Sequence, residues 1–330
     1  MIAALILTGL VLFGLGATTG HLSSRAERYF SPSGRLIDAG GIRQHVVEKR
    51  PSDSDVPVLV MIHGAYGSAE EFAISLMPET AGRFRSIAID RPGHGYSARG
   101  EDTPVSPAKQ ARYLEAALRH LQVEKPVILL GFSYGGAVAL SYALQYPGRV
   151  ASMVLISPAT HRYEKSAFSL SDITLAPLIG PLLRHTIVTP VGHLLIDDGV
   201  ERVFAPGPVP AAYQNVPVEL SIRPHSYGAN AEDIEILSAF LGRQAEQYRT
   251  LSMPIFVVAN DDDRIVSPAL HSRKLAKDAP HAELIIVEGG GHPLHFSRPD
   301  AVLDAIGRAA AAVRSGADDL QRVVGPQGRQ

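Results

Sequence analysis

Residues 127–136 read Val-Ile-Leu-Leu-Gly-Phe-Ser-Tyr-Gly-Gly. The apolar residues at the start predict a buried strand, and the small residues after Gly136 predict a helix, so Ser133 falls on the turn between them. Gly131 and Gly135 remove side chains that would collide where the strand and the helix nearly touch. A turn this sharp presents the Ser133 hydroxyl at the sheet edge, beside the backbone N–H groups that begin the helix. Ser133 is therefore a candidate nucleophile, and an ordinary glycine-rich loop is the alternative.

Outward from this turn, the chain alternates between strand-like and helix-like patterns. Residues 108–121 and 301–313 place apolar side chains on one helical face. Ala39-Gly40-Gly41 separates two strand-like runs and predicts a hairpin. Short runs rich in Val and Ile, typical of parallel strands buried on both faces, occur at 56–62, 85–89, 127–130, 152–156, 255–258 and 284–287. The predicted fold class is α/β: a mostly parallel twisted sheet with helices on both faces and an inserted helical lid.

The alternation stops over residues 161–250, which are rich in proline and have no strand rhythm. Near its end, Asn230 with Asp233 three residues later predicts a capped helix start before an apolar stripe. We interpret this segment as the lid. It divides the sheet domain into a first part, 34–160, and a second part, 251–315, and residues 316–330 are expected to be a flexible tail.

The N-terminus has a different composition. Ile2 to Gly20 carries no charged residue and, as a helix, would extend roughly 28 Å, about one bilayer core. We interpret residues 1–22 as a single-pass transmembrane anchor and 23–33 as a linker. A cleaved signal peptide is an alternative, although no Lys or Arg precedes Arg25; a buried globular helix would need a packing partner. Arg25 and Arg28 weakly favour a cytoplasmic catalytic domain, and the membrane face stays open.

Overall composition excludes several classes of function. Lys and Arg total 31 and Asp and Glu total 33, which leaves a formal charge of -2 and no basic excess for nucleic acid. Cysteine is absent, so disulfides, thiol nucleophiles and Cys-ligated metals are excluded. No dinucleotide or phosphate-binding motif suggests a cofactor.

A serine nucleophile needs a base and a group that orients the base. Asn260-Asp261-Asp262-Asp263 follows one predicted strand, and Glu288-Gly289-Gly290-Gly291-His292 follows the next. Because the carboxyl ends of parallel strands meet at one sheet edge, one of these aspartates and His292 can converge on the serine. A metal site at the three aspartates is the alternative, but no histidine stands at metal-ligand spacing.

In addition to these elements, two further motifs are informative: His63-Gly64-Ala65-Tyr66 and Asp90-Arg91-Pro92-Gly93-His94-Gly95-Tyr96-Ser97. With them, the chain resembles the α/β-hydrolase superfamily over roughly residues 34–314. The resemblance implies that the acid lies three residues after a glycine; Asn260 replaces that glycine, which maps the acid to Asp263 and leaves Asp261 and Asp262 as rivals. It also implies an oxyanion hole formed by the N–H groups of Ala65 and Tyr134.

The resemblance implies a serine hydrolase that cleaves an ester-like bond of a fairly apolar small molecule through Ser133, His292 and Asp263. C–C bond hydrolysis and acyl transfer on the same triad are alternatives, and a non-catalytic, membrane-tethered binding module is a third. No cofactor, metal or nucleic acid is expected, and the lipid bilayer is the expected partner of the N-terminal helix. His63 and His94 are expected to be structural, and His295 to lie at the surface or pocket rim. Tyr66 is expected at the pocket or the surface.

Overall fold

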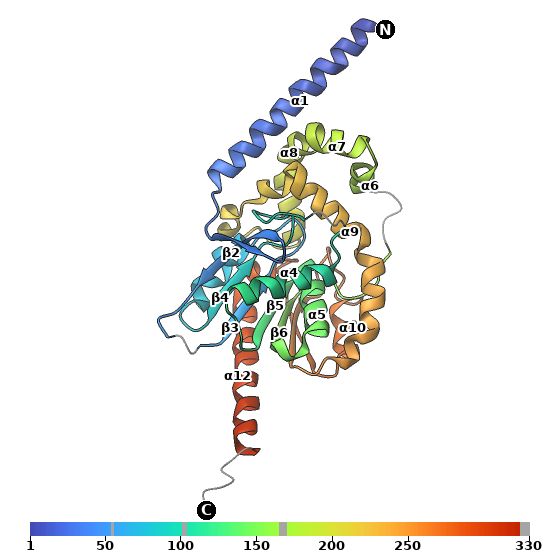
Figure 1. Cartoon of the computed structure of the whole chain (residues 1–330). Helices are drawn as coiled ribbons and strands as arrows, with labels where there is room; N and C mark the ends of the chain where they lie inside the picture. The colour runs from blue at the N-terminus through green and yellow to red at the C-terminus, as the bar shows by residue number, and fades with distance from the viewer. Residues whose placement is uncertain (54–55, 101–103, 165–169, 324–330) are drawn as a thin grey trace, which may run out of the picture.

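Eight strands form one sheet in the order β1-β2-β4-β3-β5-β6-β7-β8 (Figure 1). This computed structural model describes residues 1–53, 56–100, 104–164 and 170–323. β1 and β2 form an antiparallel hairpin, β2 is antiparallel to β4, and all other neighbours are parallel. The strands are β1 Arg35–Ala39, β2 Ile42–Lys49, β3 Val58–Ile62, β4 Arg85–Ile89, β5 Val127–Phe132, β6 Val150–Ile156, β7 Ile255–Asn260 and β8 Ala282–Val287. The predicted hairpin and the mostly parallel sheet are confirmed.

The central strands are apolar on both sides because helices cover both faces of the sheet. In β3, Val60 and Ile62 face one core cluster while Leu59 and Met61 face the other. The first cluster includes residues of α4 Pro107–His120, α5 Tyr134–Gln145 and α10 Ser272–Asp278, and the second includes residues of α2 Glu70–Ser75, α3 Met77–Thr80 and α12 Pro299–Val323. Two buried faces explain the continuous apolar runs in the sequence.

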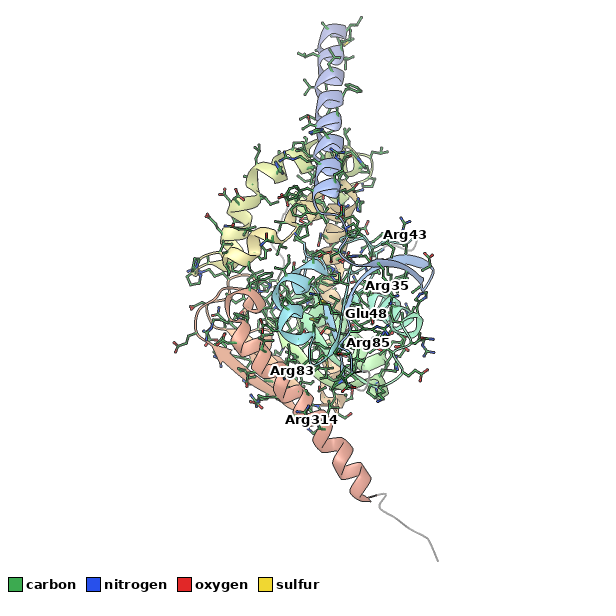
Figure 2. The ribbon with its side chains drawn as sticks, turned by 90° about the vertical axis from the view of Figure 1, so that its left-hand side faces the viewer. Arg35, Arg43, Glu48, Arg83, Arg85 and Arg314 are labelled. Carbon is green, nitrogen blue, oxygen red and sulfur yellow. The ribbon has the colours of Figure 1, made fainter. Side chains whose placement is uncertain are left out.

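Ion pairs link β1, β2 and β4 at the sheet edge that carries the hairpin. Glu48 on β2 accepts hydrogen bonds from Arg35 on β1, at 2.8 Å, and from Arg85 on β4, at 2.7 Å (Figure 2). Arg35 is 54% exposed, so its pair with Glu48 contributes about 0–1 kcal/mol, whereas Arg85 and Glu48 are largely buried.

Helices and turns fill the chain between β6 and β7. They are α6 Leu170–Leu175, α7 Ile179–Leu183, η2 Arg184–Val188, α8 Thr189–Phe204, η3 Ala211–Asn215, η4 Val218–Ile222, α9 Pro224–Gln244 and η5 Ala245–Thr250. Residues 157–164 and 170–254 contain no strand, and residues 165–169 of the predicted lid lie outside the described residues. The predicted start of α9 at Asn230 is wrong. The helix begins at Pro224, whose missing N–H suits the first helical position, and Asn230 lies in its interior.

Both ends of the chain are more helical than expected. Helix α1 runs from Ile2 to Tyr29, through residues 23–29 of the expected linker. Helix α12 continues to Val323, into the expected flexible tail, and residues 324–330 of that tail lie outside the described residues. Polarity made these segments look irregular, but residues 23–29 and 316–323 contain no proline that would end a helix. Figure 1 shows α1 and α12 extending from opposite ends of the domain.

Candidate active site

Ser133 occupies a strained turn between β5 and α5. Its φ of 52° and ψ of −118° lie outside the ordinary regions for a residue with a side chain. The flanking glycines allow the turn: a Cβ on Gly135 would lie 2.1 Å from the Ile62 carbonyl oxygen, and one on Gly131 would lie 2.6 Å from that of Gly135. The Ser133 N–H donates to the Ile156 carbonyl oxygen at 2.9 Å. Sheet and helix thus fix the backbone that carries the hydroxyl.

The structure brings Ser133, His292 and Asp263 together. His292 Nε2 lies 2.9 Å from Ser133 Oγ, and His292 Nδ1 lies 2.7 Å from Asp263 Oδ2. Burial alone would raise the pKa of the Asp263 carboxyl, but the hydrogen bond and charge of His292 outweigh it and hold that pKa below its usual value. Asp263 therefore stays ionised and can hold the imidazole in the tautomer that accepts the serine proton.

The loop after β7 places only one of its three aspartates at His292. Asp263 is buried and its Oδ1 accepts from the N–H groups of Ile265 and Val266, at 2.8 and 3.0 Å. Asp261 is exposed and pairs with Arg273, and Asp262 is also exposed.

Two polar side chains that sequence reasoning did not assign to the site hold the His292 loop. Asn260, which stands where the resemblance expects glycine, donates from Nδ2 to the Gly291 carbonyl oxygen at 3.0 Å. Ser157 donates from Oγ to the His292 carbonyl oxygen at 3.0 Å. The substitution of glycine by Asn260 therefore adds a link between the loops that carry Asp263 and His292.

The end of α8 covers the His292 loop. The His292 N–H donates to the Val203 carbonyl oxygen at 2.8 Å, and a Cβ on Gly291, whose φ is +66°, would lie 2.4 Å from the Phe204 carbonyl oxygen. Ser133 is 8% exposed and His292 is 5% exposed. Little of either side chain therefore reaches solvent in this arrangement.

The two predicted oxyanion donors flank Ser133 in the fold. Tyr134 is the first residue of α5, so its N–H has no carbonyl partner within the helix. The loop at Gly64 passes so close that a Cβ there would lie 3.1 Å from Ser133 Cβ, which brings the neighbouring Ala65 to the nucleophile. This close approach explains why glycine occupies position 64. Assignment of the two N–H groups to an oxyanion remains a prediction.

The family model for the α/β hydrolase fold matches residues 57–299. The chain belongs to the α/β-hydrolase fold family. Together with relatives named as hydrolases and esterases, this membership makes the protein an enzyme of the hydrolase type.

This α/β hydrolase is similar to several characterised proteins. It is 30% identical over 271 residues to the magnesium-chelatase 30 kDa subunit of Rhodobacter capsulatus, which covers 80% of this chain and 89% of that protein. It is 26% identical to the pimeloyl-[acyl-carrier protein] methyl ester esterase of Xanthomonas axonopodis pv. citri, covering 78% of this chain and 96% of that one. A probable 1-acylglycerol-3-phosphate O-acyltransferase of Oryza sativa subsp. japonica is 39% identical over 111 residues, but that match spans only 33% of this chain and 27% of the rice protein.

Solved structures agree on the fold. A putative lipase from Acinetobacter baumannii AYE superposes with a TM-score of 0.67 at 19% identity, covering 90% of this chain and 97% of that one. An enol-lactonase from Burkholderia xenovorans LB400 superposes with a TM-score of 0.68 at 16% identity, covering 84% and 100%.

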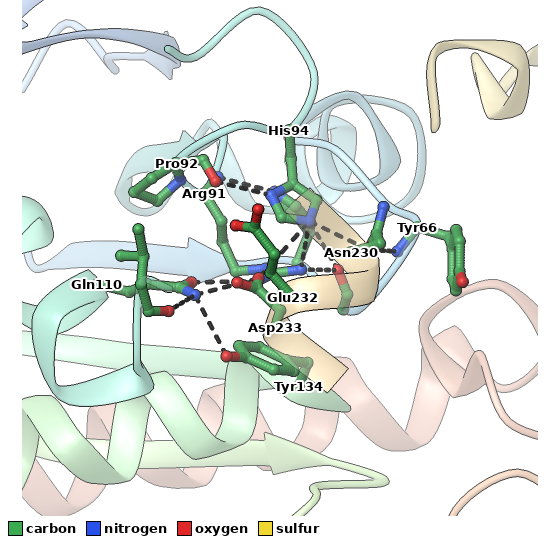
Figure 3. A network of polar contacts seen from close by, with 12 residues as sticks. Tyr66, Arg91, Pro92, His94, Gln110, Tyr134, Asn230, Glu232 and Asp233 are labelled. Atoms are coloured by element: carbon green, nitrogen blue, oxygen red, sulfur yellow. Dashed lines mark hydrogen bonds and ion pairs between the residues drawn. The ribbon is translucent and has the colours of Figure 1, made fainter. Parts of the chain in front are cut away.

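A buried polar network joins helix α9 to the loop that carries Ala65 in this hydrolase (Figure 3). Asn230 Oδ1 accepts from the Tyr66 N–H at 2.7 Å and lies 3.1 Å from His94 Nε2. Tyr66 has a φ of 57° and is 36% exposed, so the hydrogen bond to Asn230 holds a strained residue next to Ala65, a predicted oxyanion donor. Asn230 thus positions this loop. The sequence did not predict this role, because Asn230 followed by Asp233 resembles the start of a helix.

The centre of the same network is a buried ion pair between Arg91 and Asp233. Arg91 Nη1 donates to Asp233 Oδ2 at 2.6 Å, and its Nη2 donates to the Gly64 carbonyl oxygen at 3.0 Å. The Arg91 guanidinium also lies 4.2 Å from the centre of the Tyr134 ring. Gln110 bridges Asp233 and the Tyr134 hydroxyl (Figure 3). The network therefore links α9 to Tyr134, one predicted oxyanion donor, and to Tyr66, which follows Ala65, the other predicted donor.

The other histidines have structural surroundings. His63 Nδ1 donates to the Gly64 carbonyl oxygen at 2.8 Å and its Nε2 accepts from the Arg91 N–H at 2.9 Å. Burial, and then the nearby charge of Arg91, lower the pKa of His63 to about 3, and burial likewise holds the pKa of His94 well below its usual value. The prediction of a surface or rim position for His295 is wrong: it is buried, its ring lies 4.5 Å from that of Phe132, and Glu71 is 3.6 Å away.

Within the described ranges, no group of three or more His, Asp or Glu residues has the arrangement to hold a metal ion. The acidic residues at positions 261–263 do not converge on one point, because Asp261 pairs with Arg273 and Asp263 pairs with His292.

Proposed function

We propose that this α/β hydrolase cleaves a carboxylic-ester-like bond of a fairly apolar small molecule through Ser133, His292 and Asp263. The observation that carries the proposal is the unbroken chain from Ser133 Oγ to His292 Nε2, at 2.9 Å, and from His292 Nδ1 to Asp263, at 2.7 Å. A buried carboxylate, an imidazole and a hydroxyl in this order are the groups needed to activate serine for acyl transfer.

In the proposed reaction, Ser133 Oγ attacks the carbonyl carbon while His292 Nε2 takes the hydroxyl proton. The charge on the carbonyl oxygen is stabilised by the N–H groups of Ala65 and Tyr134. His292 then gives its proton to the leaving alkoxide, and an acyl-enzyme forms. Water, deprotonated by His292, attacks this ester, and the serine leaves with the same proton. Asp263 stabilises the imidazolium in both halves.

Acyl transfer is the main alternative, in which an alcohol instead of water accepts the acyl group. It is favoured by the similarity to plant proteins named as acylglycerol-phosphate acyltransferases, over about a third of this chain. Hydrolysis of a C–C bond would use the same three side chains. A binding module without activity is disfavoured because nucleophile, base and acid lie in contact.

We also propose that α1 anchors the enzyme in a membrane as a single-pass N-terminal helix. Its length and apolar composition are sufficient to cross a bilayer, and Thr19 and Ala26 are its only buried residues among those described. The exposure of nearly all of α1 argues against the alternative of a buried core helix. Arg25 and Arg28 beside the charge-free run favour a cytoplasmic catalytic domain.

A panel of p-nitrophenyl esters from acetate to palmitate tests the proposed activity, with Ser133→Ala as the control for background hydrolysis. We expect hydrolysis by the wild-type enzyme and a loss of at least about 10³-fold in the variant. Adding a glycerol-based alcohol and analysing products distinguishes hydrolysis, which releases free acid, from transfer, which yields a new ester. Equal rates for the two proteins on every ester would refute the proposal.

A further inference from the structure

Helices α7 and α8 carry a set of exposed, large apolar side chains that the chain leaves uncovered. Leu178, just before α7, is 89% exposed and Leu194 on α8 is 81% exposed. The set, here called the apolar lid face, is completed by Ile179, Leu182 and Leu195. Exposed apolar side chains grouped in this way mark contact with a membrane or another protein.

The sequence from α7 to the first half of α8 has few charged residues, and exposed Asp197 and Asp198 follow it on α8. Within residues 176–196, Arg184 is the only Asp, Glu, Lys or Arg. Its side chain turns inward, donating from Nη1 to the Thr174 carbonyl oxygen at 2.9 Å and packing beside Gly228 on α9. Arg184 is therefore directed away from the apolar lid face, and the nearest acidic residues on α8 are Asp197 and Asp198, three and four residues after Leu194.

Helix α1 contacts the same part of the domain. Thr19 Oγ1 donates to the carbonyl oxygen of Thr186, in the turn η2 that joins α7 to α8, at 3.3 Å. The exposed N-terminal part of α1 extends past α7 and α8, and these helices are the part of the domain nearest to it in both views (Figures 1 and 2). The lid and the proposed anchor therefore share one side of the molecule.

The contact at Thr19 also indicates where the lid lies relative to a bilayer that α1 would cross. Residues 2–18 of α1 would span about 25 Å, close to the thickness of a bilayer core. If these residues cross the bilayer, Thr19 and the lid turn that it touches lie at the bilayer surface. Charged residues begin only beyond this point, at Arg25.

We propose that the apolar lid face lies in the interfacial layer of the bilayer that α1 enters. This inference rests on the proposed anchor but not on the chemistry of Ser133. Leu10 and Phe13 of α1 are also exposed, and α1 contacts this part of the domain through Thr19, which favours lipid as the occupant. A protein partner would have to cover both surfaces at the level of the membrane.

Because the full chain has no cysteine, single cysteines can report the surroundings of chosen positions. Leu194→Cys, Leu10→Cys and Arg314→Cys are each labelled with the fluorophore NBD. The full-length proteins are then reconstituted in vesicles of phosphatidylcholine and phosphatidylglycerol, with and without nitroxide-labelled lipid. Arg314, exposed and at the opposite end of the domain from α1 in Figure 2, is the matched aqueous control.

We expect NBD at position 194 to emit at shorter wavelength than at 314 and to lose severalfold more fluorescence to nitroxide lipid, as at position 10. If position 10 is quenched but 194 behaves like 314, the lid inference is wrong while the anchor stands. A blue shift at 194 without quenching would show cover by protein, for example a second copy, and would overturn the inference. If neither 10 nor 194 is quenched, both anchor and inference fail. Ester hydrolysis is assayed separately, so a failure of this inference is distinguishable from a failure of the proposed function.

Discussion

The side-chain oxygen of Asn230, in the interior of α9, accepts a hydrogen bond from the backbone N–H of Tyr66, 2.7 Å away. The bond joins the segment predicted as a lid to the loop that carries a predicted oxyanion donor, Ala65. Small displacements of such a donor are costly, since a misplacement of about 1 Å can reduce rates about 100-fold.

Asn230→Ala is therefore expected to lower kcat about 10- to 100-fold with a smaller change in KM, because the misplaced N–H acts on the transition state. Asn230→Asp keeps an oxygen acceptor at the same position and should retain more activity. Steady-state kinetics on a soluble ester measure both effects, with thermal unfolding to establish that each variant is folded. An unchanged kcat in a folded Asn230→Ala would show that Asn230 has no positioning role.

Asp233→Asn should strongly destabilise the enzyme. It leaves Arg91 buried without its counter-charge, and breaking a buried pair from one side costs about 3–5 kcal/mol. Glu232→Gln is the matched control on the adjacent residue: Glu232 pairs only at the partly exposed edge, with Arg99, and its loss should cost about 1 kcal/mol or less. Urea unfolding in a fixed detergent measures both variants. Equal losses in the two would contradict a central role for the Arg91–Asp233 pair.

Asp263→Asn should reduce ester hydrolysis by about 10⁴-fold, because the amide no longer selects the reactive tautomer of His292. Asp261→Asn and Asp262→Asn remove exposed carboxylates of the same loop and should stay within about threefold of wild type, as expected for substitutions outside the catalytic unit. The comparison uses kcat/KM on one ester. A larger loss in either neighbouring variant than in Asp263→Asn would show that the acid has been assigned to the wrong residue.

Protonation of His63 should make the fold sensitive to mild acid. With a pKa of about 3 in the folded state and an ordinary value of 6.5 when unfolded, the unfolded chain binds more protons between these values. The free energy of unfolding therefore falls as the pH falls below 6.5, by roughly 2 kcal/mol from pH 7 to 5 for this group alone. His63→Gln should show a pH dependence shallower by that amount in urea unfolding. The same slope in both proteins would mean that His63 titrates normally in the fold.

Local patterns predicted the sheet and the serine turn, because their signals lie within a few consecutive residues. The runs ending at Ile62 and Ile156 are buried on both faces, and Gly131 and Gly135 are required by contacts within the turn itself. Loop position then predicted that one of the three aspartates would meet His292, and the family resemblance mapped that acid to Asp263.

The network around Arg91 could not be predicted in the same way, because its partner Asp233 lies in another element, far along the chain. Asn230 carried a misleading signal: Asn followed by an acidic residue three positions later is typical of a helix start. The better signal was Pro224, which stands at the first position of α9. His295 stands three residues after His292, and only the fold shows that it lies beside Phe132 and Glu71.

The most direct test of the account is intact-protein mass spectrometry after treatment with a fluorophosphonate, which reacts covalently with activated serines. We predict one adduct per wild-type chain, located by peptide mapping at Ser133, and none on Ser133→Ala under the same conditions. Ser133→Ala should show the same thermal unfolding as wild type, since the hydroxyl contributes little packing. An adduct of equal extent on Ser133→Ala, or no adduct on a folded wild-type enzyme, would contradict the assignment of Ser133 as the nucleophile.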